Sequence, residues 1–373
     1  MKERKFTFLG SQRFADFFRI GGMESFIRRL GFELARRGYR VDYLVYGANR
    51  EKEISPAPRI YVKYIRSLRD ALAIIISSDH SDVIRVWMER DERFQYFQWI
   101  LSTANQDFNV YHLWFCVPDS PIKRLLTYAE FAALSYRGHV FCVSPRQFRL
   151  LRFLGRGAKI HLLLPPVPEY FFLKPEEKAL KWPIKVTFLG VLHPDKGIKE
   201  VIKLFTALHD DPRFKFTIFA AHDSHSVCQR QLHEQLLAQD GFVYTPMERD
   251  VLWSIDLEKK VQEVLKETDI FVQPFLSLQN TVDIPLLVLE AMASLCIVLT
   301  TQIGSIPEIY GKSPFIIPHK HFIEEAIALL KGIDEEQLRK ERLRIYRRNK
   351  ELGFSQTEVA EKFLEMVEGK GKP

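Results

Sequence analysis

The clearest candidates for chemistry in this 373-residue chain are acidic residues beside a predicted helix start, between residues 268 and 309. Asp283 precedes Pro285, and proline suits the first turn of a helix while an acid suits its positive end. The first N–H groups of a helix have no partner inside that helix. The positions Ile284, Pro285, Leu286 and Leu287 therefore predict an anion site, with phosphate as the expected ligand.

Glu290 is the second informative residue, because it interrupts the apolar run LLVLEAMA. A carboxylate buried there without a partner would cost several kcal/mol, so it should meet a hydroxyl, a cation or water. The alternative is an acid on the solvated stripe of an amphipathic helix. Asp283 lies seven residues earlier, so both carboxylates could face one side of the helix. Two acids beside a phosphate site suggest a ligand that carries both phosphate and sugar hydroxyls.

A candidate cation stands in the loop GVLHPDKG, where Lys196 precedes Gly197 at the start of a helix predicted over 198–208. An ammonium group there could neutralise a diphosphate and stabilise the charge that grows on it as a sugar leaves. The alternative is a surface lysine in a turn.

The elements that must position these residues are strand–loop–helix–strand units. Short apolar runs at 270–273 and 297–300 flank the helix predicted over 285–294. A similar unit opens the chain, with a strand at 5–9, a loop ending in Gly21 and Gly22, a helix at 25–37 and a strand at 41–46. The glycine pair permits close backbone approach to a ligand where that helix begins.

The segment from Pro285 to Glu308 resembles the donor-site signature of the family-4 GT-B glycosyltransferases (glycosyltransferase group 1). Leu-Glu-Ala-Met-Ala stands at 289–293 and Gly-Ser-Ile-Pro-Glu at 304–308, in the order that the family has them. The resemblance implies two Rossmann-like domains with parallel sheets facing a cleft, and a retaining reaction. It also implies a nucleotide-diphosphate sugar as co-substrate, with no other cofactor.

The resemblance also implies roles for single residues. Lys196 and the helix start would hold the diphosphate beside Gly190, Glu290 would bind ribose hydroxyls, and Gly21 and Gly22 would let the acceptor or a phosphate approach. Two positions differ from the family, since Val282 stands where it has its first Glu and Val191 where it has an Arg. We expect Asp283, the neighbour of Val282, to bind a sugar hydroxyl instead.

The family also has a histidine at the end of a strand in its N-terminal domain. In NVYHLWFCVPDS the strand end is occupied by Phe115, Cys116 and Val117, and His112 lies too early. We therefore expect His112 in the core or at an edge of the sheet.

The rest of the chain alternates strands with helices, which predicts doubly wound parallel sheets. A proline-rich segment at 165–183 is typical of a linker between an N-terminal domain (1–168) and a C-terminal domain (183–350). The last segment, 354–373, resembles the family's helix that crosses back to the N-terminal domain. The other strands are expected at 60–65, 83–87, 110–115, 140–143, 160–164, 185–189, 214–220, 242–244 and 315–317, and the other helices at 68–77, 91–103, 122–135 and 145–154.

The net charge of +7 is uneven, because residues 1–170 carry 27 Lys and Arg against 17 Asp and Glu, whereas residues 171–373 carry 27 against 30. A basic half could attract phosphate-bearing ligands or an anionic membrane surface, although a charge-rich solvated surface would look the same. No helix-turn-helix, zinc-finger or aromatic ribonucleoprotein motif points to nucleic acid.

The four cysteines form no C-x-x-C motif, so they suggest neither a zinc site nor disulfides. The spacings of His193, His222, Asp223 and His225 fit no known metal-ligand set. No run of about 18 apolar residues occurs. We expect a cytoplasmic protein, with peripheral membrane contact through the basic domain as an option.

Together with these observations, the resemblance implies a metal-independent glycosyltransferase of the hexosyltransferase type, whose acceptor is a glycan, a lipid-linked molecule or a small molecule. Lys196, Asp283 and Glu290 are the expected catalytic residues. The competing hypothesis is a non-catalytic family member that binds a sugar nucleotide or a partner protein, which Val191 and Val282 favour. A dinucleotide oxidoreductase would need G-x-G-x-x-G after a strand, and the chain has no such run.

Overall fold

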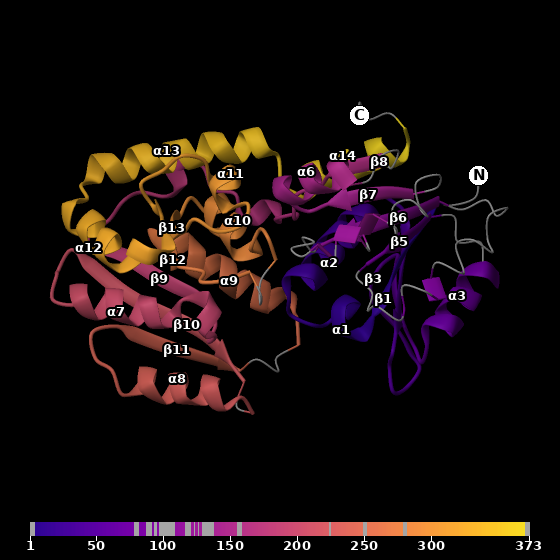
Figure 1. Cartoon of the computed structure of the whole chain (residues 1–373), viewed down its shortest axis with the longest axis horizontal. Helices are drawn as coiled ribbons and strands as arrows, with labels where there is room; N and C mark the ends of the chain where they lie inside the picture. The colour runs from indigo at the N-terminus through magenta and orange to yellow at the C-terminus, as the bar shows by residue number, and fades with distance from the viewer. Residues whose placement is uncertain are drawn as a thin grey trace. The chain divides into compact units, whose positions relative to one another are not determined.

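The computed structural model describes residues 4–77, 82–86, 92, 95–96, 109–115, 121–122, 124–125, 127–128, 138–154, 159–223, 225–248, 252–278 and 282–369. The chain divides into two compact units, which Figure 1 shows in one view. Unit 1 comprises Met1–Pro166 and Gln356–Pro373, and unit 2 comprises Val167–Ser355.

The described residues of unit 1 form an eight-stranded sheet with the order β3-β4-β2-β1-β5-β6-β7-β8. All neighbouring strands are parallel except β3, which is antiparallel to β4. The strands are β1 (Lys5–Ser11), β2 (Arg40–Tyr46), β3 (Lys52–Ala57), β4 (Ile60–Ile65), β5 (Asp82–Arg85), β6 (Asn109–Trp114), β7 (Gly138–Cys142) and β8 (Lys159–Leu162).

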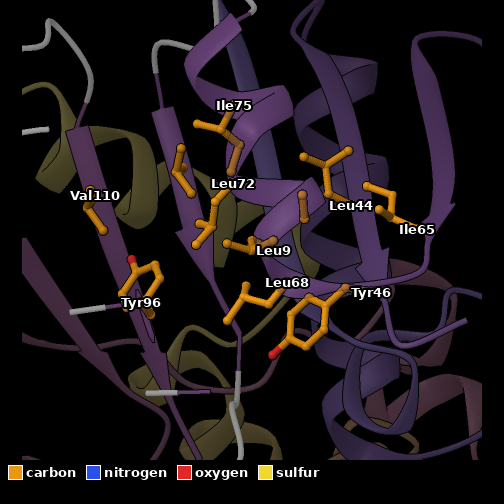
Figure 2. Close-up of a cluster of buried hydrophobic side chains, with 11 residues drawn as sticks. Leu9, Leu44, Tyr46, Ile65, Leu68, Leu72, Ile75, Tyr96 and Val110 are labelled. Carbon is orange, nitrogen blue, oxygen red and sulfur yellow. The ribbon is translucent and has the colours of Figure 1, made fainter. Parts of the chain in front are cut away.

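Apolar residues of several strands meet one helix in the core of unit 1, as Figure 2 shows. Leu72 and Ile75 of α3 (Leu68–Ser77) pack with Leu9 of β1 and with residues of β2, β4, β5 and β6. Burial of these side chains stabilises the sheet by about 25 cal/mol for each Å² of apolar surface removed from water. The full set is Leu9, Leu44, Tyr46, Ile65, Leu68, Ala71, Leu72, Ile75, Val83, Tyr96 and Val110.

The last helix of the chain, α14 (Gln356–Val367), belongs to unit 1 and packs on α2 (Gly22–Arg36). Phe363 of α14 is fully buried, with its ring centroid 5.7 Å from that of Phe6 and 5.1 Å from that of Phe141. The core of unit 1 is therefore completed by residues that follow unit 2 in the sequence. Unit 1 also contains α1 (Gln12–Ala15) and α6 (Pro145–Leu154), and the described residues at 92, at 95–96 and between 121 and 128 are helical as well.

Unit 2 is built on a six-stranded parallel sheet with the order β11-β10-β9-β12-β13-β14. The strands are β9 (Ile184–Val191), β10 (Phe214–His222), β11 (Val243–Glu248), β12 (Ile270–Gln273), β13 (Ile297–Thr301) and β14 (Ile316–Ile317). The helices are α7 (Ile198–Leu208), α8 (Val227–Leu237), α9 (Ile255–Glu267), α10 (Leu286–Ala293), α11 (Ile306–Tyr310), α12 (Phe322–Gly332) and α13 (Glu335–Leu352). Short 3₁₀ turns lie at Glu169–Phe171, Pro175–Glu177, Pro194–Lys196 and His319–His321.

The predicted fold class, an α/β protein with two Rossmann-like units, is confirmed. The expectation of wholly parallel sheets is wrong at one edge, because the antiparallel strand β3 had not been predicted. None of the residues of β3 is buried, so the strand has no apolar face to reveal it in the sequence. Most of the helix expected at 91–103, and part of the one at 122–135, lie outside the described residues.

Candidate functional site

The predicted anion site lies at the start of α10, which follows β12 and leads into β13. The helix begins at Leu286, and Pro285 is its N-cap residue, not a residue of its first turn as predicted. The amide of Val288 donates to the carbonyl oxygen of Pro285 at 3.0 Å, so the amides of Leu286 and Leu287 precede that first bond. Leu286 and Leu287 are half-buried, whereas Ile284 is buried. The helix start therefore offers N–H groups beside side chains that solvent partly reaches.

Asp283 is buried, and its carboxylate contacts the loop after β13. The Ser305 hydroxyl donates to Asp283 Oδ2 at 2.5 Å, and the Ser305 amide donates to the Asp283 carbonyl oxygen at 3.2 Å. Gly304, with φ 55°, allows this approach, since a Cβ there would lie 2.7 Å from the same carbonyl oxygen. Asp283 thus joins the start of α10 to the loop that precedes α11. Its role as a sugar-binding carboxylate stays a prediction.

Glu290 lies in the second turn of α10 with only 4% of its surface exposed. The alternative of an acid on a solvated helix stripe is therefore wrong. Residues on both sides of it in the helix, Leu289 and Ala291, are fully buried. A carboxylate in such surroundings is suited to polar contacts that a few well-placed hydroxyl groups supply.

Lys196 is held over the loop that follows β12. Its Nζ lies 5.2 Å from the centroid of the Phe275 ring, and the Leu276 amide donates to the Asp195 carbonyl oxygen at 2.9 Å. Burial lowers the pKa of Lys196 to about 8, and the charge of Asp195 opposes this shift. Among the described residues, Lys196 Nζ has no ion-pair partner and no hydrogen bond. The alternative of an ordinary surface lysine is therefore not favoured.

Gly197 fixes the position of this lysine. It has φ 73°, and a Cβ at this position would lie 2.0 Å from the Pro274 carbonyl oxygen. Only glycine fits so close to backbone in the left-handed region. The turn before α7 and the loop after β12 are therefore in direct contact.

Gln273 was not singled out in the sequence, although it lies at the centre of this edge of the sheet. It is the last residue of β12 and is 2% exposed, and within the described chain its Oε1 atom has no hydrogen-bond partner. Its Nε2 atom lies 2.9 Å from where a Cβ of Gly190 would stand. Gly190 thus admits the Gln273 amide at the carboxyl end of β9. A polar residue ending the apolar run IFVQ was the available signal.

The predicted site in unit 1, at Gly21 and Gly22, holds a carboxylate of the chain itself. Gly22 is the first residue of α2, and a Cβ on Gly21 would lie 2.2 Å from Glu24 Oε2. Glu24 is buried, which raises its pKa, while Arg19 and Arg28 act in the opposite direction. Gly21 therefore makes room for Glu24, and the approach of a ligand there stays a prediction.

His112 lies in β6 and is buried, as expected, but it is not a satisfied core histidine. Neither ring nitrogen has a hydrogen-bond partner among the residues that the structure describes. Burial and the nearby Arg85 hold the pKa of His112 well below its usual range, so the ring is neutral. Phe115 follows the end of β6, and Cys116 and Val117 lie outside the described residues.

Two kinds of feature are absent from the described residues. These residues contain no group of three His, Cys, Asp or Glu side chains arranged to hold a metal ion. No described helix is both long and apolar enough to span a bilayer.

Comparison with known proteins places part of the chain in a family. Residues 183–332 match the family described as glycosyl transferases group 1. A comparison with curated proteins finds no match.

Solved structures show the same fold at low sequence identity. The catalytic domain of starch synthase IV from Arabidopsis thaliana, bound to ADP and acarbose, is 12% identical over 99% of this chain and 99% of that chain, with a TM-score of 0.63. Anabaena Alr3699/HepE, in complex with UDP and glucose, is 11% identical over 98% and 100%, with a TM-score of 0.66. The N-terminal domain of Candida albicans trehalose-6-phosphate phosphatase is 10% identical over 99% and 97%, with a TM-score of 0.70.

Proposed function

The chain contains a group 1 glycosyl transferase domain on a GT-B fold, and on this premise we propose that it moves a sugar from a nucleotide-diphosphate sugar to an acceptor hydroxyl. The observation that carries the proposal is the half-buried ammonium of Lys196, which has no ion-pair partner among the described residues and stands at the carboxyl edge of a parallel sheet. A cation in that position needs an anion, and ligands of open α/β sheets bind at this edge.

The proposed roles combine the geometry with the resemblance. Lys196 and the amides of Leu286 and Leu287 bind the diphosphate, and Glu290 accepts hydrogen bonds from the ribose hydroxyls. The bond between the anomeric carbon and the diphosphate oxygen breaks, the acceptor oxygen bonds to that carbon, and the hydroxyl proton is released. Negative charge grows on the diphosphate in this step, so Lys196 stabilises the transition state more than the ground state.

Asp283 is the proposed second carboxylate, in place of the acid missing at Val282. One of its oxygens accepts from Ser305, which would fix the side chain for contact with a sugar hydroxyl. The proposed reaction is retaining and independent of metal, as the family resemblance supports. Gly21 and Gly22, at the start of α2, are the proposed place where the acceptor or a phosphate approaches the backbone of unit 1.

UDP or ADP bound to proteins of the same fold supports a nucleoside diphosphate as the leaving group. The test is incubation of the protein with radiolabelled UDP-, GDP- and ADP-sugars, with release of free sugar or transfer to an added acceptor as the readout. The parent should turn over one of these donors, and Lys196→Ala should lose at least about tenfold in kcat. A variant that changed only KM would contradict the role of Lys196.

A second candidate function, a non-catalytic sugar-nucleotide binder, is favoured by Val191 and Val282. Both side chains are half-buried, and neither can carry the charge that the family has there. Thermal-shift measurements with the same nucleotide sugars separate the candidates, because a ligand that binds only the folded state raises the midpoint. A midpoint shift with no turnover of any donor would identify the binder.

A further inference from the structure

A helical segment of unit 1 exposes an apolar stripe. The described residues between 121 and 128 are helical, and Ile122, Leu125 and Tyr128 are 73%, 68% and 52% exposed. Their spacing places them along one side of the helix. Thr127, only 4% exposed, marks the buried side. Large exposed apolar side chains that repeat along one side of a helix are typical of a surface that contacts a partner or a membrane.

The helix α6 repeats this arrangement. Leu151 is fully buried against Trp114, Val140 and Cys142, and Phe148 and Leu154 pack on the same cluster. The outer side carries Phe153, which is 78% exposed, and the exposed arginines Arg149 and Arg152. The guanidinium of Arg152 lies 5.4 Å above the ring of Phe148. The solvent side of α6 therefore carries an exposed phenyl ring, that of Phe153, beside two exposed arginines.

The topology brings the two helices to the same face of the sheet. The strands β6, β7 and β8 are parallel and follow one another across the sheet in one direction (Figure 1). The segment 121–128 lies in the connection from β6 to β7, and α6 is the connection from β7 to β8. Right-handed connections that advance in one direction place their helices side by side on one face. α2 connects β1 to β2 in the opposite direction, so it covers the other face.

This part of the chain is also strongly basic. Residues 109–166 carry eight Lys and Arg but only two Asp and Glu. The exposed cations described on the two helices are Arg124, Arg149 and Arg152. We call these three arginines, together with Ile122, Leu125, Tyr128 and Phe153, the apolar-basic face.

We propose that the apolar-basic face binds the surface of an anionic lipid bilayer. Apolar side chains separated by arginines suit an interface where rings and aliphatic chains enter the lipid and guanidinium groups stay at the headgroups. Each cation near such a surface adds to binding through the negative surface potential. The inference goes beyond the proposed transfer reaction, because vesicle binding needs no donor sugar and no residue of unit 2.

The test is co-sedimentation of the full chain with vesicles of phosphatidylcholine alone and of phosphatidylcholine with phosphatidylglycerol. The parent should sediment with the anionic vesicles and be released by added salt. The double variant Arg149→Gln/Arg152→Gln should weaken binding by roughly fivefold for each arginine. The double variant Leu125→Ser/Phe153→Ser should weaken it by about tenfold or more.

A matched control is available in unit 2, where Val227 and Leu237 are 60% and 62% exposed. Val227→Ser/Leu237→Ser should bind anionic vesicles as the parent does, and unchanged circular dichroism would show that all variants are folded. Failure of the parent to bind anionic vesicles, or an equal loss in the control, would overturn the inference. A dimer in size-exclusion chromatography that Leu125→Ser/Phe153→Ser converts to a monomer would also overturn it, since the face would then bind a second copy.

Discussion

The buried carboxylate of Glu290 can be tested for its proposed contact with the ribose hydroxyls. The carboxylate is almost completely buried in an apolar helix, at the carboxyl edge where we place the nucleotide. Hydrogen bonds from hydroxyls to a charged carboxylate contribute about 1.5–3 kcal/mol each, and an amide would lose the charge-assisted part. Glu290→Gln should therefore weaken binding of the nucleoside diphosphate by about tenfold or more in titration calorimetry. The exposed acid Glu325 provides the control, and equal affinities of Glu290→Gln and Glu325→Gln would contradict the ribose contact.

Lys196 predicts a pH dependence of donor binding. Burial lowers its pKa to about 8, so the side chain is a cation below that pH and becomes neutral as the pH rises through it. A bound diphosphate favours the cation, so the dissociation constant should be flat below pH 8 and then rise by up to about tenfold per pH unit. Calorimetry at pH 9 in two buffers of different ionisation enthalpy should show uptake of about one proton. Lys196→Arg stays charged and should show neither effect; persistence of both effects in Lys196→Arg would assign them to another group.

The role of Asp283 can be tested by comparing a variant of Asp283 with a variant of Ser305, its hydrogen-bond partner. If the carboxylate serves only to hold the loop at Ser305, Asp283→Asn should cost no more turnover than Ser305→Ala, because the Asn amide oxygen can still accept from the Ser305 hydroxyl, whereas Ser305→Ala removes this hydrogen bond. If Asp283 also orients a sugar hydroxyl, Asp283→Asn should reduce turnover about a hundredfold. Ser305→Ala should then retain most of the turnover, since the carboxylate is still present. Donor turnover and melting temperature of both variants decide between these outcomes.

Some residues of the site could be read from the sequence and others could not. Lys196, Glu290 and the α10 start stand out because their types are unusual in a short local pattern. Gln273 and Ser305 do not stand out in the sequence, because their importance depends on contacts with residues far away in the chain. Gln273 contacts Gly190, and Ser305 contacts Asp283. Such contacts depend on strand order and on loop paths, which one sequence does not reveal.

At the scale of elements, apolar periodicity decided which parts were predictable. The helices α3, α6 and α7 have the limits expected from their patterns, because each buries one apolar stripe against a sheet. The strand β3 was not expected because it is an edge strand with little to bury. The start of α10 was placed one residue early, since proline is compatible with both the N-cap and the first turn.

The contact between the turn before α7 and the loop after β12 predicts that Gly197 contributes both to the stability of unit 2 and to the position of Lys196. Gly197→Ala would combine the strain of a positive φ with a clash against the Pro274 carbonyl. Gly311 is a control in the same unit, because it also has a positive φ of 83°, but a Cβ there would meet only the Arg344 side chain, at 3.3 Å. Its ψ of −178° places it in a region that glycine occupies almost exclusively, so Gly311→Ala should cost about 1–3 kcal/mol of unfolding free energy. Gly197→Ala, which adds the clash with backbone, should cost more.

The same two variants should differ in ligand binding. Displacement of the turn moves Lys196, so Gly197→Ala should also weaken nucleoside diphosphate binding by about tenfold, whereas Gly311→Ala should leave it unchanged. Thermal unfolding and calorimetry measure the two effects separately. Equal behaviour of the two variants would show that the close approach at Pro274 does not position the lysine.

At the scale of the whole molecule, the last helix of the chain belongs to unit 1, whereas the proposed donor site lies in unit 2. The stability of unit 1 can therefore be changed without altering a residue of the donor site. Phe363 of α14 is fully buried against Phe6, Tyr111 and Phe141, which lie in three strands of the unit 1 sheet. Removal of a buried phenyl ring costs about 3–5 kcal/mol. In Phe363→Ala, amide hydrogen exchange should therefore accelerate in α2, β1 and β6 of unit 1.

Phe363→Ala should leave hydrogen exchange in unit 2 unchanged, because the aromatic partners of Phe363 named above all belong to unit 1. Exchange in β9 and β12 should match the parent, and a nucleoside diphosphate that binds the parent should still slow exchange in the loop after β12. Glu365 is an exposed residue of the same helix, and Glu365→Ala should leave both units unchanged. Faster exchange in β9 and β12 of Phe363→Ala would show instead that the donor site depends on the last helix, and that the two units unfold together.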